Sequence, residues 1–334
     1  MTKIILTGGG TAGHCIPLLS IVDDLKGVFD EVYYIGEKGG IEERLCQEKG
    51  ITFYGITAVK LDRAKLVKNL KMPFKLWESV KQAKKLLLEI KPDIVFAKGG
   101  YVSLPTAIAA GILKIKLVIH ESDMTLGLAN KLCLPYANKV LTSYDTTYKK
   151  GICVGNPVRK EIFEGKTGRI HFGNDKKAIL VMGGSSGSKT INELIKNAID
   201  SLSDYNVIHI VGKSTVDIKG DNYYSIPFSE RIQDLYAQAD LVISRGGANA
   251  LSELTALGKR AIIIPLPKGV SRGDQVENAK YYAEKGLVDV ITEDNLTTEN
   301  LVQAIENSFK KPKPIPTKTE ANRRIIEEIE NMIL

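Results

Sequence analysis

Cysteine, histidine and tryptophan are scarce in this chain of 334 residues, which contains four cysteines, four histidines and one tryptophan. The cysteines Cys15, Cys46, Cys133 and Cys153 are scattered and form no C-x-x-C pair. This spacing argues against a disulfide framework and a cysteine zinc site, and it favours reduced thiols in a cytoplasm. Next to a glycine-rich turn, Cys15 is expected to be a small buried residue rather than a reactive thiol.

Long hydrophobic runs are also absent. No apolar stretch reaches about 18 residues, the length that a transmembrane helix needs. The first residues run directly into a predicted strand, without the zones of a signal peptide. With 43% hydrophobic and 25% charged residues, the composition is that of a globular protein. At roughly 150 residues per domain, the length predicts two domains.

The net charge of +7 comes from one segment. Residues 60–85 contain nine basic residues and two acidic ones, which leaves 37 of each sign in the rest of the chain. A general nucleic-acid-binding protein usually spreads its basic surface more widely. We therefore expect a local basic patch and no nucleic-acid partner.

Short apolar runs alternate with helix-length segments, which predicts parallel sheets covered by helices. Nine strands are expected, at residues 3–8, 31–36, 93–100, 116–121, 139–144, 177–184, 206–213, 240–247 and 260–267. Helices are expected between them, and Gly258 is expected to end one of these helices. The proline- and glycine-containing stretch 154–169 is predicted to connect two α/β domains, each with a doubly wound sheet.

A glycine-rich turn follows the first strand of each half. Gly8, Gly10 and Gly13 fit the G-x-G-x-x-G pattern of dinucleotide-binding turns, and Glu37 stands where an acid would hold an adenosine ribose. The bulky His14 and Pro17 argue against a smooth helix there. The second turn, residues 183–187, repeats the order glycine, glycine, hydroxyl, any residue, glycine. Neither turn has the G-K-[ST] ending of a P-loop, so an ATPase is disfavoured and two phosphate-binding turns are expected.

The stretch "SRGGANALSELTALG" carries the most specific local signal. A strand ends at Ser244, two glycines form a turn, and a helix begins near Ala248 with free N–H groups that can bind a pyrophosphate. Glu253, a little over one turn later, can accept hydrogen bonds from two ribose hydroxyls. Downstream, Gln275 and Asn278 lie on one face of the next helix, where their amides can bind sugar hydroxyls.

The motifs "GGGTAGH-x-x-P", "HES-D-x-x-x-GLAN", "VGNPVR", "GGSSGS", "SRGGANALSEL" and "DQVENA" together resemble the MurG family, over nearly the whole chain. The resemblance implies a GT-B fold of two Rossmann-like domains that face each other across a cleft. It implies an acceptor- and membrane-binding domain at 1–158, a UDP-GlcNAc-binding domain at 159–316, and a C-terminal helix at 317–334 that packs back on the first domain. The implied activity is inverting transfer of GlcNAc from UDP-GlcNAc to lipid I, giving lipid II for peptidoglycan synthesis.

Site residues follow from the resemblance position by position. The acceptor is expected to contact Gly9, Gly10 and Tyr101. Asp123 stands where some members have asparagine, Ser229 falls where backbone groups bind uracil, and Gln275 matches the amide that holds GlcNAc. The full set of expected donor contacts is Thr11, Ala12, Gly13, Asp123, Arg159, Ser185, Ser229, Ala248, Asn249, Ala250, Leu251, Ser252, Glu253 and Gln275.

Inversion requires a base near the acceptor hydroxyl and stabilisation of the leaving diphosphate. His14 is the first choice for the base, because an imidazole titrates near neutral pH, and Glu121 is the second. No D-x-D metal motif follows a strand, so we expect no metal or other cofactor and assign diphosphate stabilisation to the helix N-terminus.

A lipid-linked acceptor gives the basic segment a role at the cytoplasmic face of the cell membrane. Lysines there are attracted to anionic lipid, and apolar side chains can enter the headgroup region. Val80 and Leu87 are instead expected to pack in the core. The predicted membrane contacts are Leu66, Leu70, Met72, Phe74 and Trp77.

Three other classes of protein remain as alternatives. A UDP-GlcNAc 2-epimerase would use the same scaffold but leaves the basic segment without a role. A dinucleotide-dependent oxidoreductase is supported only by one glycine motif and Glu37. A basic binding protein without catalytic activity is disfavoured by the neutrality of the chain outside residues 60–85.

Overall fold

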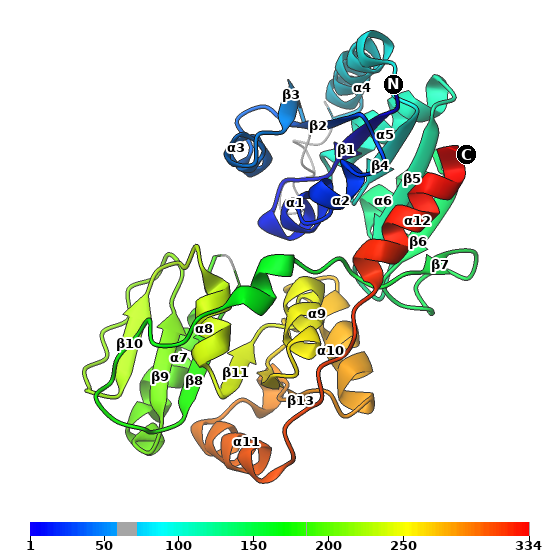
Figure 1. The fold of residues 1–334 in the computed structure, drawn as a ribbon. Helices are drawn as coiled ribbons and strands as arrows, with labels where there is room; N and C mark the ends of the chain where they lie inside the picture. The colour runs from blue at the N-terminus through cyan, green and yellow to red at the C-terminus, as the bar shows by residue number, and fades with distance from the viewer. Residues whose placement is uncertain (59–71, 185, 334) are drawn as a thin grey trace. The chain divides into compact units, whose positions relative to one another are not determined.

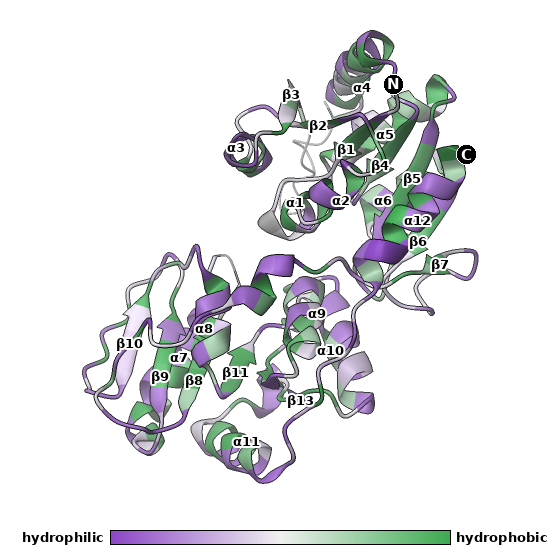
Figure 2. Ribbon diagram, in the orientation of Figure 1, coloured by the Kyte–Doolittle hydropathy of each residue, from purple (hydrophilic) through white to green (hydrophobic). Residues whose placement is uncertain are grey.

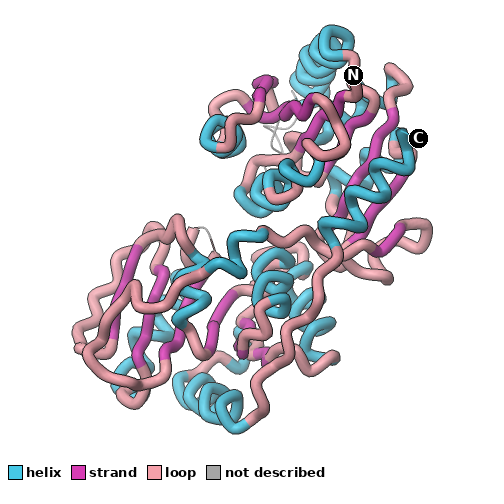
Figure 3. The backbone as a smooth tube through the Cα atoms, viewed as in Figure 1, coloured by secondary structure: helices cyan, strands magenta, loops and turns pink. Residues whose placement is uncertain are grey.

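The computed structural model describes residues 1–58, 72–184 and 186–333, and it contains two compact α/β units (Figures 1 and 3). One unit comprises Met1–Arg159 and Thr319–Leu334, and the other comprises Lys160–Lys318. The domain boundaries expected from the sequence, 158/159 and 316/317, differ from these by one and two residues. The segment joining the units, which includes the 3₁₀ helix η3 (Lys160–Glu164), lies in the predicted connection.

The first unit is built on a seven-stranded sheet in which all neighbouring strands are parallel. The spatial order is β3-β2-β1-β4-β5-β6-β7, so β1 lies between β2 and β4. The bounds are β1 (Lys3–Thr7), β2 (Glu31–Glu37), β3 (Thr52–Ile56), β4 (Ile94–Ala97), β5 (Lys116–Glu121), β6 (Lys139–Thr142) and β7 (Ile152–Cys153).

Helices cover both faces of this sheet, because alternate strand residues are apolar on each side. Figure 2 shows the hydrophobic residues concentrated in the central strands and on the inner sides of the helices. One face carries α1 (Ala12–Leu19), α2 (Val22–Leu25), α3 (Ile41–Glu48) and α12 (Ala321–Ile333). The opposite face carries α4 (Met72–Ile90), α5 (Ser103–Ile112), α6 (Leu128–Cys133) and the 3₁₀ helix η2 (Leu134–Tyr136).

The C-terminal helix α12 is part of the first unit, although it is the last element of the chain. Its side chains Ile325 and Ile329 are fully buried in the core with residues of α1, α2 and β1. The Asn322 side chain accepts a hydrogen bond from the Val158 N–H and donates one to the Val158 carbonyl, both at 3.0 Å. The apolar face of this amphipathic helix therefore packs in the core of the first unit.

The second unit repeats the same architecture on a six-stranded parallel sheet, in the order β10-β9-β8-β11-β12-β13. Its strands are β8 (Ala178–Met182), β9 (Asn206–Ile210), β10 (Tyr223–Ile226), β11 (Leu241–Ser244), β12 (Arg260–Ile263) and β13 (Asp289–Val290). Its helices are α7 (Lys189–Ala198), η4 (Ile199–Leu202), α8 (Ile232–Gln238), α9 (Ala248–Ala256), α10 (Asp274–Glu284), η5 (Glu293–Asn295) and α11 (Thr298–Lys310).

Four strands of the two sheets, β3, β7, β10 and β13, were not predicted from the sequence. Each is the outermost strand of its sheet, and β7 and β13 contain two residues each. An edge strand pairs on one side only and is partly exposed, so it lacks the continuous apolar run of a central parallel strand. The other nine strands lie where the sequence predicted them.

Two local predictions about helices had different outcomes. Gly258 follows the last residues of α9 with a φ of +59°, which confirms it as the residue that ends this helix. The expectation that Pro17 disturbs the first helix was wrong, because α1 continues through Pro17 to Leu19. Among the described residues, no helix is long and apolar enough to cross a membrane.

Candidate functional site

Each unit has a topological switch point, where two neighbouring strands are followed by connections that run in opposite directions. In the first unit this point lies between β1 and β4, and in the second between β8 and β11. Ligands of doubly wound sheets bind at the carboxyl ends of the strands at such a point. The predicted glycine turns follow β1 and β8, and further glycine pairs follow β4 and β11.

The first glycine turn is closely packed against its neighbours. Gly10 has a φ of +78°, and a Cβ atom there would collide with the ring of Tyr101. A Cβ atom on Gly9 would collide with the carboxylate of Glu42, which is completely buried beneath the turn. Both glycines are therefore required by space, and at Gly10 also by backbone conformation.

Glu37 has a partner that the dinucleotide interpretation did not anticipate. Its Oε2 accepts a hydrogen bond of 2.6 Å from the hydroxyl of Tyr101, which lies in the loop after β4. Burial and this acceptor raise the pKa of Tyr101, so the phenol remains protonated and donating. Glu37 therefore holds the aromatic ring that supports Gly10.

His14 lies in the first turns of α1 and is half-buried. Its Nδ1 is 2.9 Å from Oγ1 of Thr11, the residue that precedes the helix. A threonine hydroxyl can donate or accept, so this contact is compatible with either tautomer of the imidazole. When Nδ1 carries the proton and donates to Thr11, Nε2 carries the lone pair that a general base needs.

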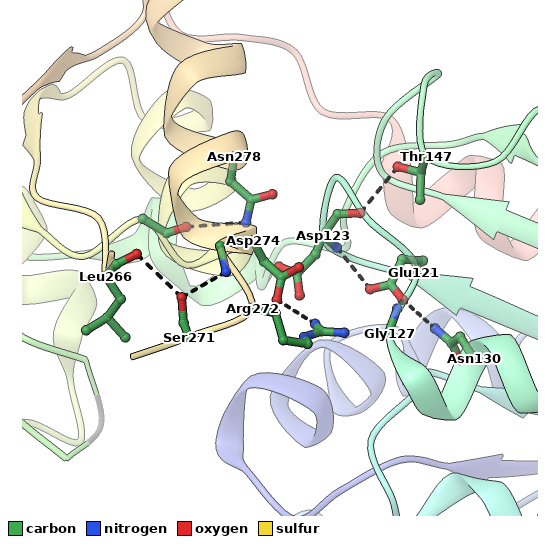
Figure 4. Close-up of polar contacts among 12 residues, drawn as sticks. Glu121, Asp123, Gly127, Asn130, Thr147, Leu266, Ser271, Arg272, Asp274 and Asn278 are labelled. Atoms are coloured by element: carbon green, nitrogen blue, oxygen red, sulfur yellow. Dashed lines mark hydrogen bonds and ion pairs between the residues drawn. The ribbon is translucent and has the colours of Figure 1, made fainter. Parts of the chain in front are cut away.

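Glu121 ends β5, is 6% exposed, and orders the loop that follows it (Figure 4). One carboxylate oxygen accepts from the N–H of Asp123 at 3.1 Å. The other accepts from the N–H of Gly127 at 2.8 Å and from the Asn130 side chain at 2.9 Å. Both oxygens are thus occupied by the β5–α6 loop, which disfavours Glu121 as the base and gives it a role in shaping this loop.

A buried lysine that was not predicted from the sequence lies at the switch point of the first unit. Lys98, directly after β4, is 1% exposed, and its Nζ contacts Nδ1 of His120 at 3.1 Å, Oγ of Ser122 at 2.5 Å and Oδ1 of Asn156 at 2.9 Å. His120 is itself completely buried, and its Nε2 lies 2.9 Å from the Gly155 carbonyl oxygen. A lysine that ends an apolar strand could have signalled such a site, because lysine is almost never buried without partners.

Arg245 in the second unit was also missed. It follows β11, is 6% exposed, and donates to the Ile264 carbonyl at 3.1 Å and to the Glu293 carboxylate at 2.6 Å. Its other terminal nitrogen donates to Oγ of Ser188 at 2.7 Å, and Ser188 caps α7. The arginine thus links the loops after β8, β11 and β12.

The helix α9 begins with Gly247 as its N-cap, so no side chain caps its first N–H groups. Glu253 on this helix is 8% exposed rather than lying on an open surface, and its Oε2 accepts from the hydroxyl of Tyr236 at 3.2 Å. Tyr236 also contacts the sulfur of Met182, the last residue of β8. The carboxylate therefore lies at the switch point of the second sheet.

Two predictions about side chains near this helix need correction. Leu251 is completely buried in the core and its N–H donates to the Gly247 carbonyl, so neither group can contact a donor. Asn278 is also completely buried, and its amide donates to the Gly246 carbonyl at 3.3 Å (Figure 4). Both residues shape the turn before α9 from beneath, which periodicity alone cannot distinguish from a ligand contact.

Gln275 lies in the first turn of α10, after a loop that Ser271 and Arg272 also order (Figure 4). Its Oε1 accepts from the Leu266 N–H at 3.1 Å, which leaves its Nε2 to donate to a ligand. The hydroxyl of Ser271 accepts from the Gly273 N–H at 3.1 Å, and Arg272 pairs with Asp274 at 2.7 Å.

Four further residues were predicted to contact the donor, and the structure describes three of them. Ser229 is half-buried in the loop between β10 and α8, beside the exposed Phe228. Arg159 is half-buried at the last residue of the first unit before the connection. Ser252 is 9% exposed with its hydroxyl 3.4 Å from that of Tyr282. Ser185 lies outside the described residues.

Helix α4 presents the apolar residues predicted to reach a membrane. Phe74 is 77% and Trp77 is 61% exposed, and the Lys81 ammonium lies 3.7 Å from the centre of the Trp77 indole. Met72 is half-buried. Leu87 is buried and Val80 packs against the core, which confirms the prediction for both. Leu66 and Leu70 lie outside the described residues.

The described residues contain no group of three or more histidine, cysteine or acidic side chains arranged to hold a metal ion. Burial raises the pKa of Cys15 to about 12, and its side chain is completely buried. Its assignment as a buried thiol rather than a nucleophile is confirmed.

Two family profiles match the chain. The Glycosyltransferase family 28 N-terminal domain matches residues 4–142, and the Glycosyltransferase family 28 C-terminal domain matches residues 178–332. Among curated proteins, the UDP-N-acetylglucosamine--N-acetylmuramyl-(pentapeptide) pyrophosphoryl-undecaprenol N-acetylglucosamine transferase of Lachnospira eligens is 42% identical, over 92% of this chain and 91% of its own. The protein of the same name from Clostridium botulinum (strain Kyoto / Type A2) is 44% identical, over 93% of this chain and 92% of its own.

Solved structures share the fold. The crystal structure of Acinetobacter baumannii MurG has a TM-score of 0.75 at 24% identity, covering 99% of this chain and 100% of its own. The UDP-GlcNAc 2-epimerase from Neisseria meningitidis bound to UDP-GlcNAc has a TM-score of 0.69 at 15% identity, with coverage of 99% and 100%. At these identities the likeness concerns the two-domain GT-B architecture alone.

Proposed function

Because the chain belongs to glycosyltransferase family 28 and to its UDP-N-acetylglucosamine--N-acetylmuramyl-(pentapeptide) pyrophosphoryl-undecaprenol N-acetylglucosamine transferases, we propose that it transfers GlcNAc from UDP-GlcNAc to lipid I. The acceptor group is the muramoyl 4-hydroxyl, and the product is lipid II for peptidoglycan synthesis. The observation that carries this proposal is identity of 42% and 44% to transferases of that name over more than nine-tenths of the chain.

The second unit supplies the donor site. The uncapped N–H groups at the start of α9 bind the diphosphate of UDP, because the positive end of the helix dipole favours an anion. Glu253 accepts from the ribose hydroxyls, and Tyr236 holds its carboxylate. The Nε2 of Gln275 donates to a GlcNAc hydroxyl. As UDP leaves, the same helix N-terminus stabilises the charge that develops on the diphosphate.

The first unit supplies the acceptor site and the base. The loop of Gly9 and Gly10, supported by Tyr101, receives the acceptor. His14 removes the proton of the attacking hydroxyl at Nε2 while Thr11 accepts from Nδ1. The anomeric carbon then forms its bond to the acceptor oxygen as its bond to UDP breaks, with inversion. Glu121 orders the loop that carries Asp123, the expected contact of the donor sugar.

The exposed face of α4 docks the enzyme on anionic lipid at the cytoplasmic face of the membrane. Phe74 and Trp77 enter the headgroup region, and the neighbouring lysines are attracted to the lipid charge. An acceptor linked to undecaprenol requires such docking, because its lipid chain stays in the bilayer.

An epimerase is the less favoured alternative. The similarity to UDP-GlcNAc 2-epimerases is one of fold, at 15% identity, whereas the more similar curated relatives are transferases. An epimerase would also leave the aromatic residues of α4 without a role.

Titration calorimetry with UDP-GlcNAc, followed by an assay of transfer to a lipid I analogue, tests the proposal. Glu253→Ala removes the acceptor of two ribose hydrogen bonds and should weaken UDP-GlcNAc binding at least about 100-fold, since hydrogen bonds to charged groups contribute about 1.5–3 kcal/mol each. Glu284→Ala is the matched control, because Glu284 is 64% exposed on α10. Unchanged binding in Glu253→Ala, or saturable binding of NADH by the wild type, would overturn the proposed donor site.

A further inference from the structure

The Lys98 ammonium joins three separate parts of the first unit. Lys98 follows β4, and its backbone N–H donates to the Thr7 carbonyl at the end of β1, at the switch point. Its Nζ reaches Ser122 in the β5–α6 loop and Asn156 in the connection to the second unit. The third partner is Nδ1 of His120, the penultimate residue of β5. Three donors of one buried ammonium therefore match three acceptors.

The buried position of Lys98 and His120 affects the protonation of both side chains. Burial and the Lys98 charge lower the pKa of His120, so its imidazole is neutral. Nε2 of His120 then donates to the Gly155 carbonyl at 2.9 Å, and Nδ1 accepts from Lys98. The charged groups acting on Lys98 are Glu121 and Asp123, both of which favour its protonated form. The cation thus lies beneath the loop expected to contact the donor sugar.

We propose that Lys98 is a positioning residue for glycosyl transfer, which through Ser122 and Asn156 holds the β5–α6 loop and the connection between the units in their active geometry. The inference rests on the proposed function and adds a residue that touches neither donor nor acceptor. Ser122 precedes Asp123, and Asn156 lies three residues before Arg159, so a shift of either partner displaces an expected donor contact. The positioning acts through these hydrogen bonds.

The proposal predicts a specific dependence on pH. Burial lowers the pKa of Lys98 to about 7, against the attraction of the two carboxylates. Above that pH the neutral amine has two donors instead of three and no longer balances Glu121 and Asp123. Because the folded state then binds fewer protons than the unfolded state, the contribution of this group to stability rises between about pH 7 and pH 10. Activity is expected to fall as the folded protein loses this proton, around pH 7.

The experiment compares Lys98→Met with Lys139→Met between pH 6 and pH 9. Lys139 is a second lysine of the same unit, and its side chain is 21% exposed. Its Nζ contacts the Glu328 carboxylate at 2.8 Å, and this contact helps to hold α12 in place. In Lys98→Met we expect kcat/KM for UDP-GlcNAc to fall about tenfold or more at pH 6.5. The alkaline loss of activity above about pH 7 should be absent, whereas the acid-side dependence on His14 should remain. Lys139→Met should keep the wild-type profile at a lower melting temperature.

Amide hydrogen exchange gives a readout that does not depend on turnover. Residues 99–101, 122–127 and 155–158 should exchange faster in Lys98→Met, and also in the wild type at pH 8.5 after correction for the intrinsic rate, but not in Lys139→Met. If the wild type fails to transfer GlcNAc, the proposed function is lost and hydrogen exchange alone decides the role of Lys98.

Ser122→Ala covers the case in which Lys98→Met does not fold. Loss of one acceptor of the ammonium lowers the pKa of Lys98 further, so the alkaline loss of activity should move to lower pH. Wild-type kcat/KM, pH profile and exchange in a folded Lys98→Met would overturn the proposal. So would an unchanged profile in Ser122→Ala where Lys98→Met cannot be purified.

Discussion

Buried polar side chains at the carboxyl ends of both sheets hold the loops that follow the strands. Glu121 and Lys98 serve the first unit, and Arg245 and Asn278 serve the second. Burying such groups without partners costs free energy, so each is tolerated because hydrogen bonds to loop groups replace those to water. Their contribution is a defined loop shape, which a catalytic site needs to within a fraction of an ångström.

The choice between His14 and Glu121 as the base leads to a residue-scale prediction. His14→Gln should lower kcat by about 10²–10⁴, the usual contribution of a general base, and leave the Kd for UDP-GlcNAc within about twofold. Stopped assays of transfer together with calorimetry measure the two quantities. Full activity of His14→Gln would exclude it as the base.

Glu121→Gln is the matched control for that experiment. Glutamine has one side-chain acceptor oxygen in place of two, so it cannot keep the hydrogen bonds to Asp123, Gly127 and Asn130 together. We expect Glu121→Gln to have a lower melting temperature than the wild type and His14→Gln to have an unchanged one. A wild-type melting temperature with a large loss of kcat in Glu121→Gln would instead support Glu121 as the base.

At the scale of elements, the helix α12 shows how the last residues of the chain complete the first unit. Its buried isoleucines close one face of the seven-stranded sheet, and Lys139 and Asn322 fix its position against β6 and the connection. The connection and α12 therefore meet at Val158, where the chain leaves the first unit. A change in α12 should act on the stability of that unit.

Ile329→Ala tests this element. Ile329 is completely buried, and replacing a buried isoleucine by alanine costs about 2–5 kcal/mol of unfolding free energy through lost burial and the cavity left behind. Denaturant unfolding, followed by circular dichroism, measures the change. Arg323→Ala on the exposed face of the same helix is the control and should unfold as the wild type does. Equal midpoints for both variants would show that α12 does not stabilise the unit.

The whole molecule uses one architecture twice. Both sheets are parallel with glycine turns at their switch points, and Gly10 and Gly184 have similar φ values of +78° and +87°. The positive charge is not shared equally, because residues 60–85 of the first unit carry the entire excess. Such an asymmetry fits one unit that docks on an anionic surface and one that binds a nucleotide sugar.

Membrane docking can be measured with liposomes containing anionic lipid. Changing Phe74 and Trp77 together to serine should weaken partitioning about tenfold or more, since each apolar side chain removed from water contributes about 1.5–3 kcal/mol when fully buried. UDP-GlcNAc affinity should not change. Phe163→Ser is the control, because Phe163 is 56% exposed in the second unit. Unchanged partitioning of the double variant would contradict the role of α4.

Features that depend on local pattern could be predicted from the sequence. Central strands were recognisable because strands covered on both faces must be continuously apolar, and glycine turns because their backbone needs positive φ. The motif set placed Glu253 after the turn that precedes α9, as the structure shows. Edge strands β3 and β10 were missed because they are half-exposed and carry no such pattern.

Which side chains are held within the protein became clear only from the tertiary structure. Leu251, Asn278, Glu121 and Glu37 share sequence neighbourhoods with expected contacts, yet their side chains bind or pack within the protein. The role of Lys98 was not predicted from the sequence, because its acceptors are 22 to 58 residues away along the chain. A hydrogen bond between residues that distant exists only once the strands are paired, so no local pattern can report it.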